Sequence, residues 1–261
     1  MKANNSNWYK KGWSLGIKNM SWVEDTENQI DFIIKTMVLT GSERILDLAC
    51  GYGRHSLSFA KRGYTVVGVD ITKEYIEDAI LTAKENDLTA DFILSDIRDI
   101  NFTNEFDVVL NLADGAIGYL ENDKENLKIF DVVSKSLKSG GKHFMDVCNA
   151  EHAETYFPKR SWSIGENEFS FSQFEWDAEK RIMLYAGGRF RYGELAKHPE
   201  ELIGNPTRLY SRDELSNIFK QRNMTVVNAF SNYCGKEPSE TEMQLLIYSR
   251  KNNSAQKSLY E

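Results

Sequence analysis

The chain has 261 residues, 41% of them hydrophobic, and a formal net charge of −7 at pH 7. That length allows one α/β domain with an inserted module, and no run approaches the ~18 consecutive apolar residues that span a bilayer. The start of the chain also lacks the apolar stretch of a secretion signal, so we expect a cytoplasmic protein without a membrane partner, present as a monomer or homodimer. An acidic chain with no basic block argues against nucleic acid as a partner, because neutralising phosphates needs a concentrated basic surface.

The three cysteines, Cys50, Cys148 and Cys234, are far apart in the sequence and form neither a CxxC pair nor a Cys/His cluster. Such spacing offers neither a metal site nor a disulfide framework. We therefore expect separate, reduced thiols and no metal.

Residues 1–40 are expected to form an N-terminal helical lid segment. Its aromatic residues either fold over a bound ligand or belong to an N-terminal helix packed on the domain; they are Trp8, Tyr9, Trp13 and Trp22. Apolar residues then recur at helical spacing before Gly41, which supplies a stop; this stripe consists of Ile30, Ile33, Ile34, Met37 and Val38.

Residues 41–150 alternate short apolar strands with helices, a pattern that indicates a parallel sheet covered on both faces. The predicted strands are Arg44–Leu48, Thr65–Asp70, Asp91–Leu94, Phe106–Leu110 and Lys142–Val147. The predicted helices are Arg54–Lys61, Lys73–Asn86 and Lys124–Leu137, with a turn at Ser139–Gly141. This part of the chain is predicted to be a doubly wound α/β core.

Residues 151–207 change character, because aromatic and polar residues alternate from Trp162 to Tyr192. Alternation of this kind predicts antiparallel strands, with turns at Trp176–Lys180 and at Gly187–Gly188. We interpret this segment as a β-rich insertion after the fifth strand. It is either a cover over the substrate or a stabilising or dimer-forming sheet.

Residues 208–251 return to the core. Ser211 and Glu214 have the spacing of a capping box at the start of a helix, and Thr225–Ala229 and Met243–Tyr248 are predicted to be the last two strands. Residues 252–261 form a polar tail.

The turn Asp47-Leu-Ala-Cys-Gly-Tyr-Gly53 joins the first strand to the first helix of the core. Glycines in such a turn let the backbone approach a ligand while helix amides point into the gap. Asp70 ends the second strand, nineteen residues beyond Gly51, where a carboxylate accepts hydrogen bonds from both ribose hydroxyls of an adenosine ligand. The segment Ile45–Ile71 therefore predicts an adenosine site.

Two adenosine cofactors fit this turn, and the residues around it separate them. A nicotinamide dinucleotide site has a third glycine three residues after the second, whereas this chain has Ser56 there. Asp47 at the strand end would repel a pyrophosphate. A cationic cofactor without phosphate is favoured over NAD, and a nicotinamide-dependent oxidoreductase is the disfavoured alternative.

The motifs resemble those of class I S-adenosylmethionine-dependent methyltransferases of the bacterial small-molecule type. Ile45 to Ser56 is similar to the first motif of that family and Gly68-Val-Asp70 to the second. The resemblance continues downstream in order and at the family's spacing, through Ser95-Asp96-Ile97, Phe106 to Asn111 and Leu137 to Lys142. It implies a Rossmann-like, seven-stranded, mostly parallel sheet whose last strand is antiparallel, and a methyltransferase that converts S-adenosylmethionine to S-adenosylhomocysteine.

The resemblance also implies positions for the cofactor contacts. The methionine end of the cofactor would contact the turn, at Ala49, Gly51 and Gly53, and Asn111 at the end of the fourth strand. The ribose would contact Asp70. The adenine would contact Asp96 and Ile97 and would stack on Ile71. Arg54 is a further candidate, as a charge-assisted partner of the cofactor carboxylate. Tyr9 and Trp13 are candidates from the lid, because an aromatic face attracts a sulfonium.

Several residues are candidates for the acceptor side. A general base helps if the acceptor is a hydroxyl or protonated amine, and the candidates after strands four and five are Tyr119, Asp146 and His152; His55 is a less favoured base. Substrate contacts are expected from Tyr119, Asn149, Arg189, Arg191 and Tyr192. The favoured function is in-line methyl transfer to a small organic molecule.

Two alternatives stay open beside this function. One is an RNA or protein methyltransferase. Enzymes that methylate the amino groups of nucleobases often have a motif similar to Asn/Asp-Pro-Pro-Tyr after the fourth strand, and Asn111-Leu-Ala-Asp departs from it, which argues against nucleobase amines as acceptors. The other is a catalytically silent module that binds the cofactor and serves as a partner or sensor.

Overall fold

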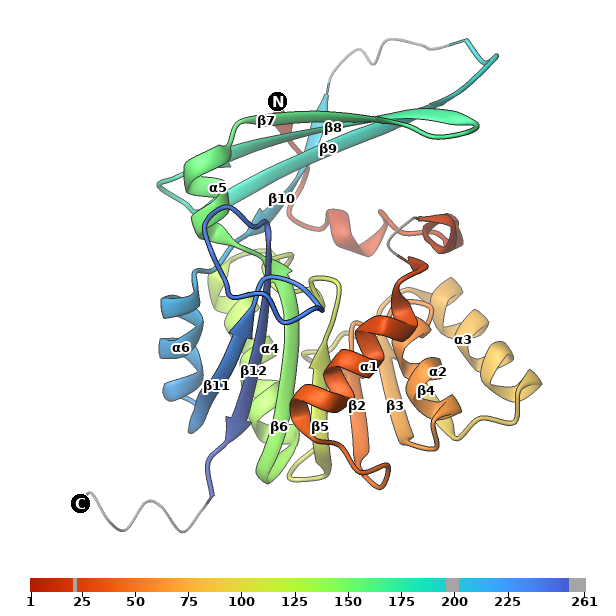
Figure 1. Cartoon of the computed structure of the whole chain (residues 1–261), viewed down its shortest axis with the longest axis vertical. Helices are drawn as coiled ribbons and strands as arrows, with labels where there is room; N and C mark the ends of the chain where they lie inside the picture. Colours follow the sequence, from red (N-terminus) through yellow and green to blue (C-terminus); the bar gives the residue numbers. More distant parts are fainter. Residues whose placement is uncertain (21–22, 196–201, 254–261) are drawn as a thin grey trace.

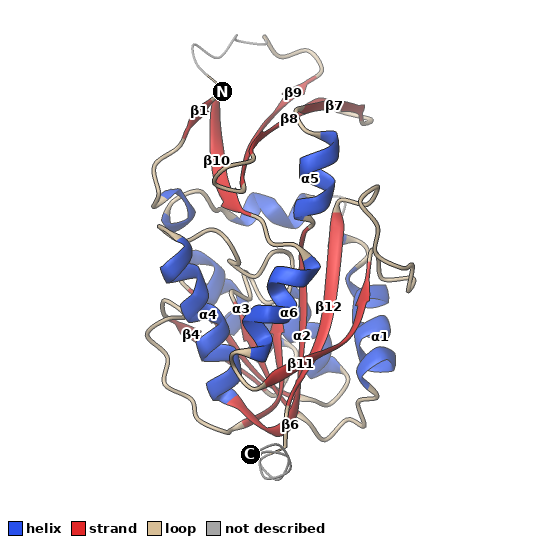
Figure 2. Cartoon of the chain, turned by 90° about the vertical axis from the view of Figure 1, so that its left-hand side faces the viewer, coloured by secondary structure: helices blue, strands red, loops and turns tan. Residues whose placement is uncertain are grey.

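The computed structural model describes residues 1–20, 23–195 and 202–253 and contains two β-sheets joined by helices and loops (Figure 1). The larger sheet has seven strands in the order β11-β12-β6-β5-β2-β3-β4. The smaller one has five strands in the order β1-β10-β9-β8-β7 and lies at one end of the molecule (Figure 2).

The seven-stranded sheet confirms the predicted fold class. Its strands are β2 (Arg44–Leu48), β3 (Thr65–Asp70), β4 (Ala90–Leu94), β5 (Phe106–Asn111), β6 (Leu137–Cys148), β11 (Met224–Phe230) and β12 (Gln244–Lys251). Strands β4, β3, β2, β5 and β6 pair in parallel, and β12 runs antiparallel to both β6 and β11. A parallel sheet of this kind brings the carboxyl ends of five strands to one edge, which is where such folds bind ligands.

Helices cover both faces of this sheet because alternate strand residues are apolar on both sides. On one face, α1 (Thr26–Met37) and α2 (Arg54–Lys61) pack against a cluster that includes Ile45 and Val108; α3 (Lys73–Glu85) lies beside α2. On the other face, α4 (Asp123–Ser136) and α6 (Arg212–Lys220) pack against a cluster that includes Leu46. The capping box predicted from Ser211 and Glu214 is present at the start of α6.

Three local predictions were wrong. Helix α1 ends at Met37, and Val38 adopts a left-handed conformation (φ 52°) with its side chain 73% exposed, so it caps the helix instead of extending its apolar stripe. Residues 139–141 lie inside β6, because Leu137 already pairs with Phe106 and the chain passes through a register irregularity without turning back. Helix α4 accordingly ends at Ser136.

The third error concerns Gly187 and Gly188, which lie inside a strand and not in a turn. A Cβ at Gly188 would lie 2.6 Å from the ring of Phe171 on the neighbouring strand. Gly188 therefore leaves space for the Phe171 ring on the neighbouring strand. From the sequence alone, a glycine in this packing role cannot be told from a glycine in a turn.

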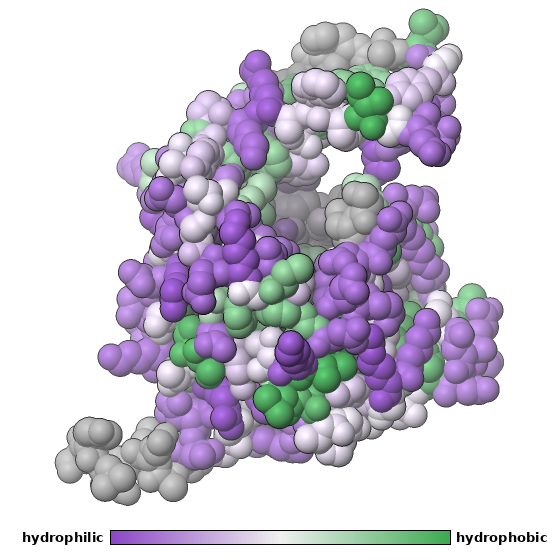
Figure 3. Space-filling model, in the orientation of Figure 1, coloured by the Kyte–Doolittle hydropathy of each residue, from purple (hydrophilic) through white to green (hydrophobic). Residues whose placement is uncertain are grey.

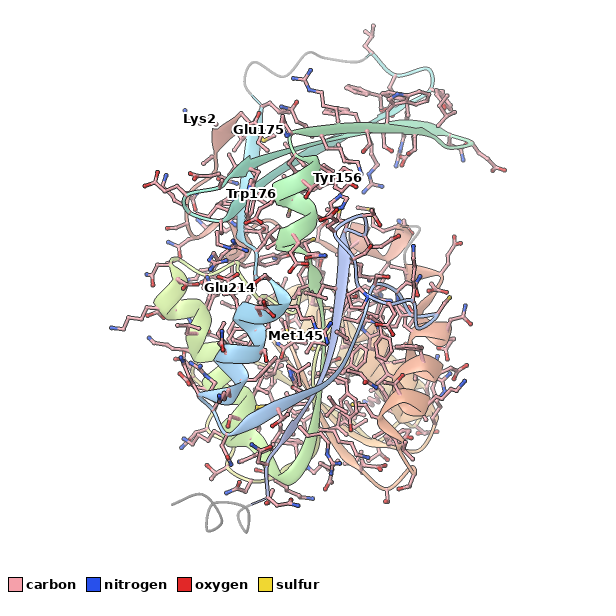
Figure 4. All side chains as sticks on the ribbon, turned by 60° about the vertical axis from the view of Figure 1, so that its left-hand side comes forward. Lys2, Met145, Tyr156, Glu175, Trp176 and Glu214 are labelled. Atoms are coloured by element: carbon pink, nitrogen blue, oxygen red, sulfur yellow. The ribbon has the colours of Figure 1, made fainter. Side chains whose placement is uncertain are left out.

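The five-stranded sheet corresponds to the predicted β-rich insertion and extends it. It consists of β7 (Lys159–Ile164), β8 (Glu168–Asp177), β9 (Ile182–Arg191), β10 (Ile203–Arg208) and β1 (Lys2–Ala3), and α5 (Ala150–Tyr156) leads into it. Strands β7 to β10 are antiparallel, whereas β1 pairs with β10 in parallel. The start of the chain is held there, since the Met1 ammonium donates to Glu175 Oε1 at 3.1 Å; Lys2 and Glu175 lie close together in Figure 4.

The five-stranded sheet arches over the N-terminal segment and the carboxyl edge of the large sheet (Figure 1). That segment forms two 3-10 helices, η1 (Trp8–Lys10) and η2 (Leu15–Asn19), before α1 begins. Residues 254–261 of the predicted tail lie outside the described residues. In the described ranges, no helix combines the length and the apolar character needed to cross a membrane.

Candidate active site

A cavity of about 600 Å³ lies at the carboxyl edge of the seven-stranded sheet. Its walls come from the ends of β2, β3, β4, β5 and β6, from the N-terminal segment, and from Tyr185 of β9. Figure 3 shows the hollow between the five-stranded sheet and the body of the molecule. The volume is within the range of about 300–1,000 Å³ that small-molecule sites use.

The turn after β2 forms the floor of this cavity. Ala49 (φ 55°) and Gly51 (φ 60°) both adopt left-handed conformations and line the cavity. The Asp70 carboxylate holds the turn, because Gly51 N donates to its Oδ2 at 2.9 Å and Thr72 N to its Oδ1 at 2.7 Å. Burial raises the pKa of Asp70, and its side chain also faces the cavity.

Gly53 has a different role from Gly51. It is the N-cap of α2 and does not contribute to the cavity wall. A Cβ at this position would lie 2.8 Å from the ring of Phe92, so the glycine permits close packing of the helix on the sheet.

Ser56 stands where a dinucleotide-binding turn has its third glycine. Its hydroxyl donates to Asp47 Oδ2 at 2.6 Å, and both residues are buried. Burial raises the pKa of Asp47 to about 7, while the Ser56 hydrogen bond acts in the opposite direction. Ser56 therefore hydrogen-bonds a buried carboxyl group, and its side chain leaves no additional space for a pyrophosphate.

The far end of the cavity is formed by Asp96 and Ile97 in the loop after β4 and by Ile71, which directly follows β3. The guanidinium of Arg98 binds both oxygens of Asp96 at 2.6 and 2.9 Å, and it also pairs with Glu121 at 2.9 Å. Arg98, which the sequence did not indicate, therefore fixes the direction of the Asp96 carboxylate and lowers its pKa.

The N-terminal segment closes one side of the cavity with Tyr9 and Trp13. The Tyr9 hydroxyl donates to Glu121 Oε1 at 2.9 Å and accepts from Arg98 at 3.3 Å. Trp13 belongs to an aromatic cluster with Trp8 and Tyr119, whose ring centroids lie 4.9 to 6.1 Å apart. Trp22, the fourth aromatic residue of the predicted lid, lies outside the described residues.

Arg54 and His55 begin α2 and line the cavity, and Gln29 of α1 holds both of them. The Gln29 side-chain oxygen accepts from Arg54 Nη1 at 2.8 Å and lies 2.9 Å from His55 Nε2. Burial lowers the pKa of His55 well below its ordinary value, so its imidazole is neutral at pH 7.

The loop after β5 brings Asp114 to the cavity. Asp114 N donates to the carbonyl of Asp146 at 2.8 Å, and the Tyr119 hydroxyl donates to Asp114 Oδ2 at 2.8 Å. Asn111 is fully buried beneath this loop and does not line the cavity; it donates to Gly115 O at 3.0 Å. Asn111 thus supports the loop from below.

Asp146, near the end of β6, completes this side of the cavity. Its carboxylate accepts hydrogen bonds from the Tyr233 hydroxyl at 2.9 Å and from Gln244 Nε2 at 3.0 and 3.1 Å. Burial, together with the nearby charge of Asp114, raises the pKa of Asp146 to about 7. One carboxyl group from the loop after β5 and one from β6 therefore share one poorly solvated wall.

Residues 45–141 match the model of a methyltransferase domain family, which spans β2 to β6 and the turn and loops described above. A methyltransferase-named protein of Geobacillus sp. (strain WCH70) is 24% identical over 217 residues, which are 81% of this chain and 85% of that protein. The fold is shared with an S-adenosylmethionine-dependent methyltransferase from Clostridium acetobutylicum at a TM-score of 0.74 and 18% identity, covering 91% of this chain and 96% of that one.

The chain contains a methyltransferase domain. A further solved structure with the same fold is that of the amino pentose methyltransferase CalS10 from Micromonospora echinaspora with bound S-adenosylmethionine. It has a TM-score of 0.62 and 17% identity, and covers 90% of this chain and 93% of that one.

Most residues predicted for the methyltransferase site lie around one cavity. The structure places there Tyr9, Trp13, Ala49, Gly51, Arg54, Asp70, Ile71, Asp96, Ile97, Tyr119 and Asp146. Gly53 and Asn111 lie beneath its wall, as described above. The predicted acceptor contacts from the insertion and from α5 do not reach it.

His152 is buried in α5 with Nδ1 2.9 Å from the carbonyl of Glu240, and Asn149 is the N-cap of that helix. Neither lines the cavity of the methyltransferase. A base role for His152 is therefore incompatible with its position, because the side chain would have to leave the packing of α5 to meet a ligand.

Arg189 and Arg191 at the end of β9, and Tyr192 directly after it, also do not line the cavity. Arg189 contacts Met20 at 3.2 Å, and the Tyr192 hydroxyl donates to the carbonyl of Gly165. Tyr185, which lies nearer the start of β9, does line the cavity. The sequence therefore predicted the insertion but not which end of β9 faces the cavity.

Sequence reasoning missed Asp114, Tyr185, Tyr233 and Gln244. Asp114 is the last residue of the quoted Asn111-Leu-Ala-Asp motif, so a signal for it existed. Tyr233 and Gln244 come from the C-terminal part of the chain, and only the pairing of β12 with β6 places them beside Asp146. In the described ranges, no group of three or more His, Cys, Asp or Glu side chains is arranged to hold a metal ion.

Proposed function

We propose that the enzyme transfers the methyl group of S-adenosylmethionine directly to a small organic molecule. One observation carries the proposal: the motif residues Asp70 and Asp96 share a single cavity with Tyr119 and with Tyr185 of the insertion. A cofactor and an acceptor would thus be enclosed together. The substrate class named for CalS10, an amino pentose, supports a small acceptor.

The cofactor would lie along the floor of the cavity. Asp70 would accept hydrogen bonds from the ribose hydroxyls, Asp96 and Ile97 would meet the adenine with Ile71 against its face, and Ala49 and Gly51 would approach the methionine end with Arg54. Gly53 and Asn111 would support these residues from beneath. The bound cofactor supplies a methyl group on a positively charged sulfur.

The cavity wall fits such a ligand in one further respect. Tyr52 lines the cavity, and its buried hydroxyl has no hydrogen-bond partner among the described residues. A buried polar atom without a partner costs free energy, which a ligand hydrogen bond would recover.

The protein's own part is to align the two reactants and to exclude water. Tyr9 and Trp13 would close over the cofactor from the N-terminal segment, and Tyr185 would cover the acceptor from the insertion. Asp146 and Tyr119 would bind polar groups of the acceptor and orient it for transfer.

Isothermal titration calorimetry with S-adenosylhomocysteine and with NAD tests the cofactor assignment. We expect binding of S-adenosylhomocysteine and none of NAD. Asp70→Ala should weaken that binding by more than about 1 kcal/mol, because a hydrogen-bonding carboxylate is lost. Asp107→Ala, which removes an aspartate paired with Lys138 away from the cavity, is the matched control and should bind as the wild type does. Binding of NAD alone would contradict the proposal.

Methyl transfer can be followed with tritiated S-adenosylmethionine and fractionated small-molecule extracts. Tyr185→Ala should leave the affinity for S-adenosylhomocysteine unchanged and lower methyl incorporation, because the tyrosine belongs to the acceptor side. Incorporation only into RNA or protein fractions would replace the small-molecule proposal with the macromolecular alternative.

A further inference from the structure

We infer that the methyl acceptor is a basic amine, bound and deprotonated by Asp114 at the acceptor side of the cavity. This inference rests on the proposed function and specifies its substrate class. It follows from the chemistry of the cavity wall that lies between the cofactor turn and the insertion.

The position of Asp114 is fixed by both neighbouring elements. Its backbone amide is tied to β6 through the Asp146 carbonyl, and its carboxylate accepts the Tyr119 hydroxyl. Asp114 itself adopts a left-handed conformation (φ 68°), which is unfavourable for a residue with a side chain. The carboxylate is thereby held against the cavity and does not turn to solvent.

The two carboxyl groups of this wall have different neighbours. The positive charge of Arg54 acts on Asp146, whereas Asp114 accepts its hydrogen bonds from neutral groups, which are the Tyr119 hydroxyl and Cys148. Burial raises the pKa of Asp114, and the negative charge of Asp114 contributes to the raised pKa of Asp146. An incoming ammonium group would bring a positive charge to Asp114 and form charge-assisted hydrogen bonds with it.

The remaining groups at this place fit the same acceptor. Trp13, Tyr119 and Tyr185 present aromatic rings to the cavity, which suit both an apolar substrate body and a cation over a ring face. The Cys148 thiol lies beside the two carboxyl groups, and burial raises its pKa well above the ordinary value, so it is neutral. A carboxylate or phosphate on the acceptor at this wall would be repelled by both aspartates.

The proton balance of the step gives Asp114 its role. The ionised carboxylate removes one proton from the substrate ammonium, which leaves a neutral amine with a free lone pair. The lone pair forms the new nitrogen–carbon bond while the sulfur–carbon bond of the donor breaks, and that electron pair stays on sulfur as a neutral thioether. The product is a methylated ammonium, and the proton on Asp114 leaves to solvent when the product does.

The test compares an isosteric pair of probes, benzylamine and benzyl alcohol, by calorimetry on the enzyme saturated with S-adenosylhomocysteine. We expect the amine to bind at least tenfold more tightly than the alcohol. Asp114→Asn should reduce amine affinity at least tenfold and leave S-adenosylhomocysteine affinity within twofold, because the amide keeps the shape and loses the charge. Tyr119→Phe provides a milder second variant, and Asp107→Asn repeats the charge change away from the cavity as a control.

Equal binding of the two probes, including binding of neither, would overturn the inference. It would also be overturned if Asp114→Asn weakened S-adenosylhomocysteine as much as the amine, because Asp114 would then serve the cofactor. A wild-type enzyme that binds no S-adenosylhomocysteine would instead overturn the proposed function. The same variants should lower transfer of tritiated methyl to amines, and transfer to alcohols alone would count against the inference.

Discussion

The buried pair of Ser56 and Asp47 makes a prediction that depends on pH. In Ser56→Ala the Asp47 carboxyl loses the 2.6 Å hydroxyl donor, and the site stays closed to water because both residues are buried. Hydrogen bonds to charged groups contribute about 1.5–3 kcal/mol to stability, and bonds between neutral groups about 0.5–1.5 kcal/mol. The cost of the substitution should therefore follow the ionisation of Asp47.

The sign follows from the raised pKa. Asp47 has a pKa of about 7 in the folded protein and 3.8 as its ordinary value, so between these pH values the folded state holds a proton that the unfolded state has lost. Its contribution to stability consequently falls as pH rises from about 4 to 7. Ser56→Ala should raise the pKa of Asp47 further and should cost about 1.5–3 kcal/mol at pH 8 but only about 0.5–1.5 kcal/mol at pH 5.5.

Urea unfolding at pH 5.5 and pH 8, followed by circular dichroism, measures this difference. Ser58→Ala is the matched control, because Ser58 is also buried in α2 but donates to Glu27, whose side chain is 64% exposed. Its cost should be small and equal at both pH values, since water replaces the lost donor. Equal costs for the two variants at pH 8, or no dependence on pH for Ser56→Ala, would refute the reasoning.

Three further predictions concern the loop, the core and the rim of the cavity. Gly118→Ala should lower the free energy of unfolding by about 1–3 kcal/mol, because a Cβ there would overlap the carbonyl oxygen of Arg208; Gly63→Ala, with open space around it, should cost less in the same denaturation assay. Burial lowers the pKa of His143 to about 3, so the free energy of unfolding should fall as pH drops below 6.5. In His143→Gln, the fall in the free energy of unfolding between pH 6 and pH 4 should be smaller by about 1.4 kcal/mol per pH unit. Arg98→Lys should weaken S-adenosylhomocysteine binding severalfold in calorimetry, because a single ammonium cannot hold the bidentate geometry of the acidic motif; unchanged affinity would remove that role.

The core of the fold was predictable because its signals are local. Helix α2 and strand β3 have the bounds that the sequence predicted, and each combines a consistent apolar pattern with a clear start and stop. The predicted turn at Gly187–Gly188 failed because a glycine that yields space to Phe171 has the same sequence signal as a glycine that turns the chain.

Short or irregular strands also escaped prediction. Strand β10 contains Gly204 and Pro206, which weaken a strand signal, and β1 has only two residues. Strand β10 is stabilised by pairing with both β9 and β1, and β1 is stabilised by pairing with β10, which is about two hundred residues away in the sequence.

The proposed cofactor side of the cavity was determined by the sequence itself. Its turn, the aspartate nineteen residues later and the acidic loop each lie at the end of a strand or directly after one, so a parallel sheet necessarily brings them to one edge. The acceptor side depended on the tertiary structure. Asp146 meets Tyr233 and Gln244 only because β12 pairs with β6, and Tyr185 reaches the cavity only because the insertion folds back over it. Contacts between segments so far apart depend on strand pairing and packing, which no local pattern encodes.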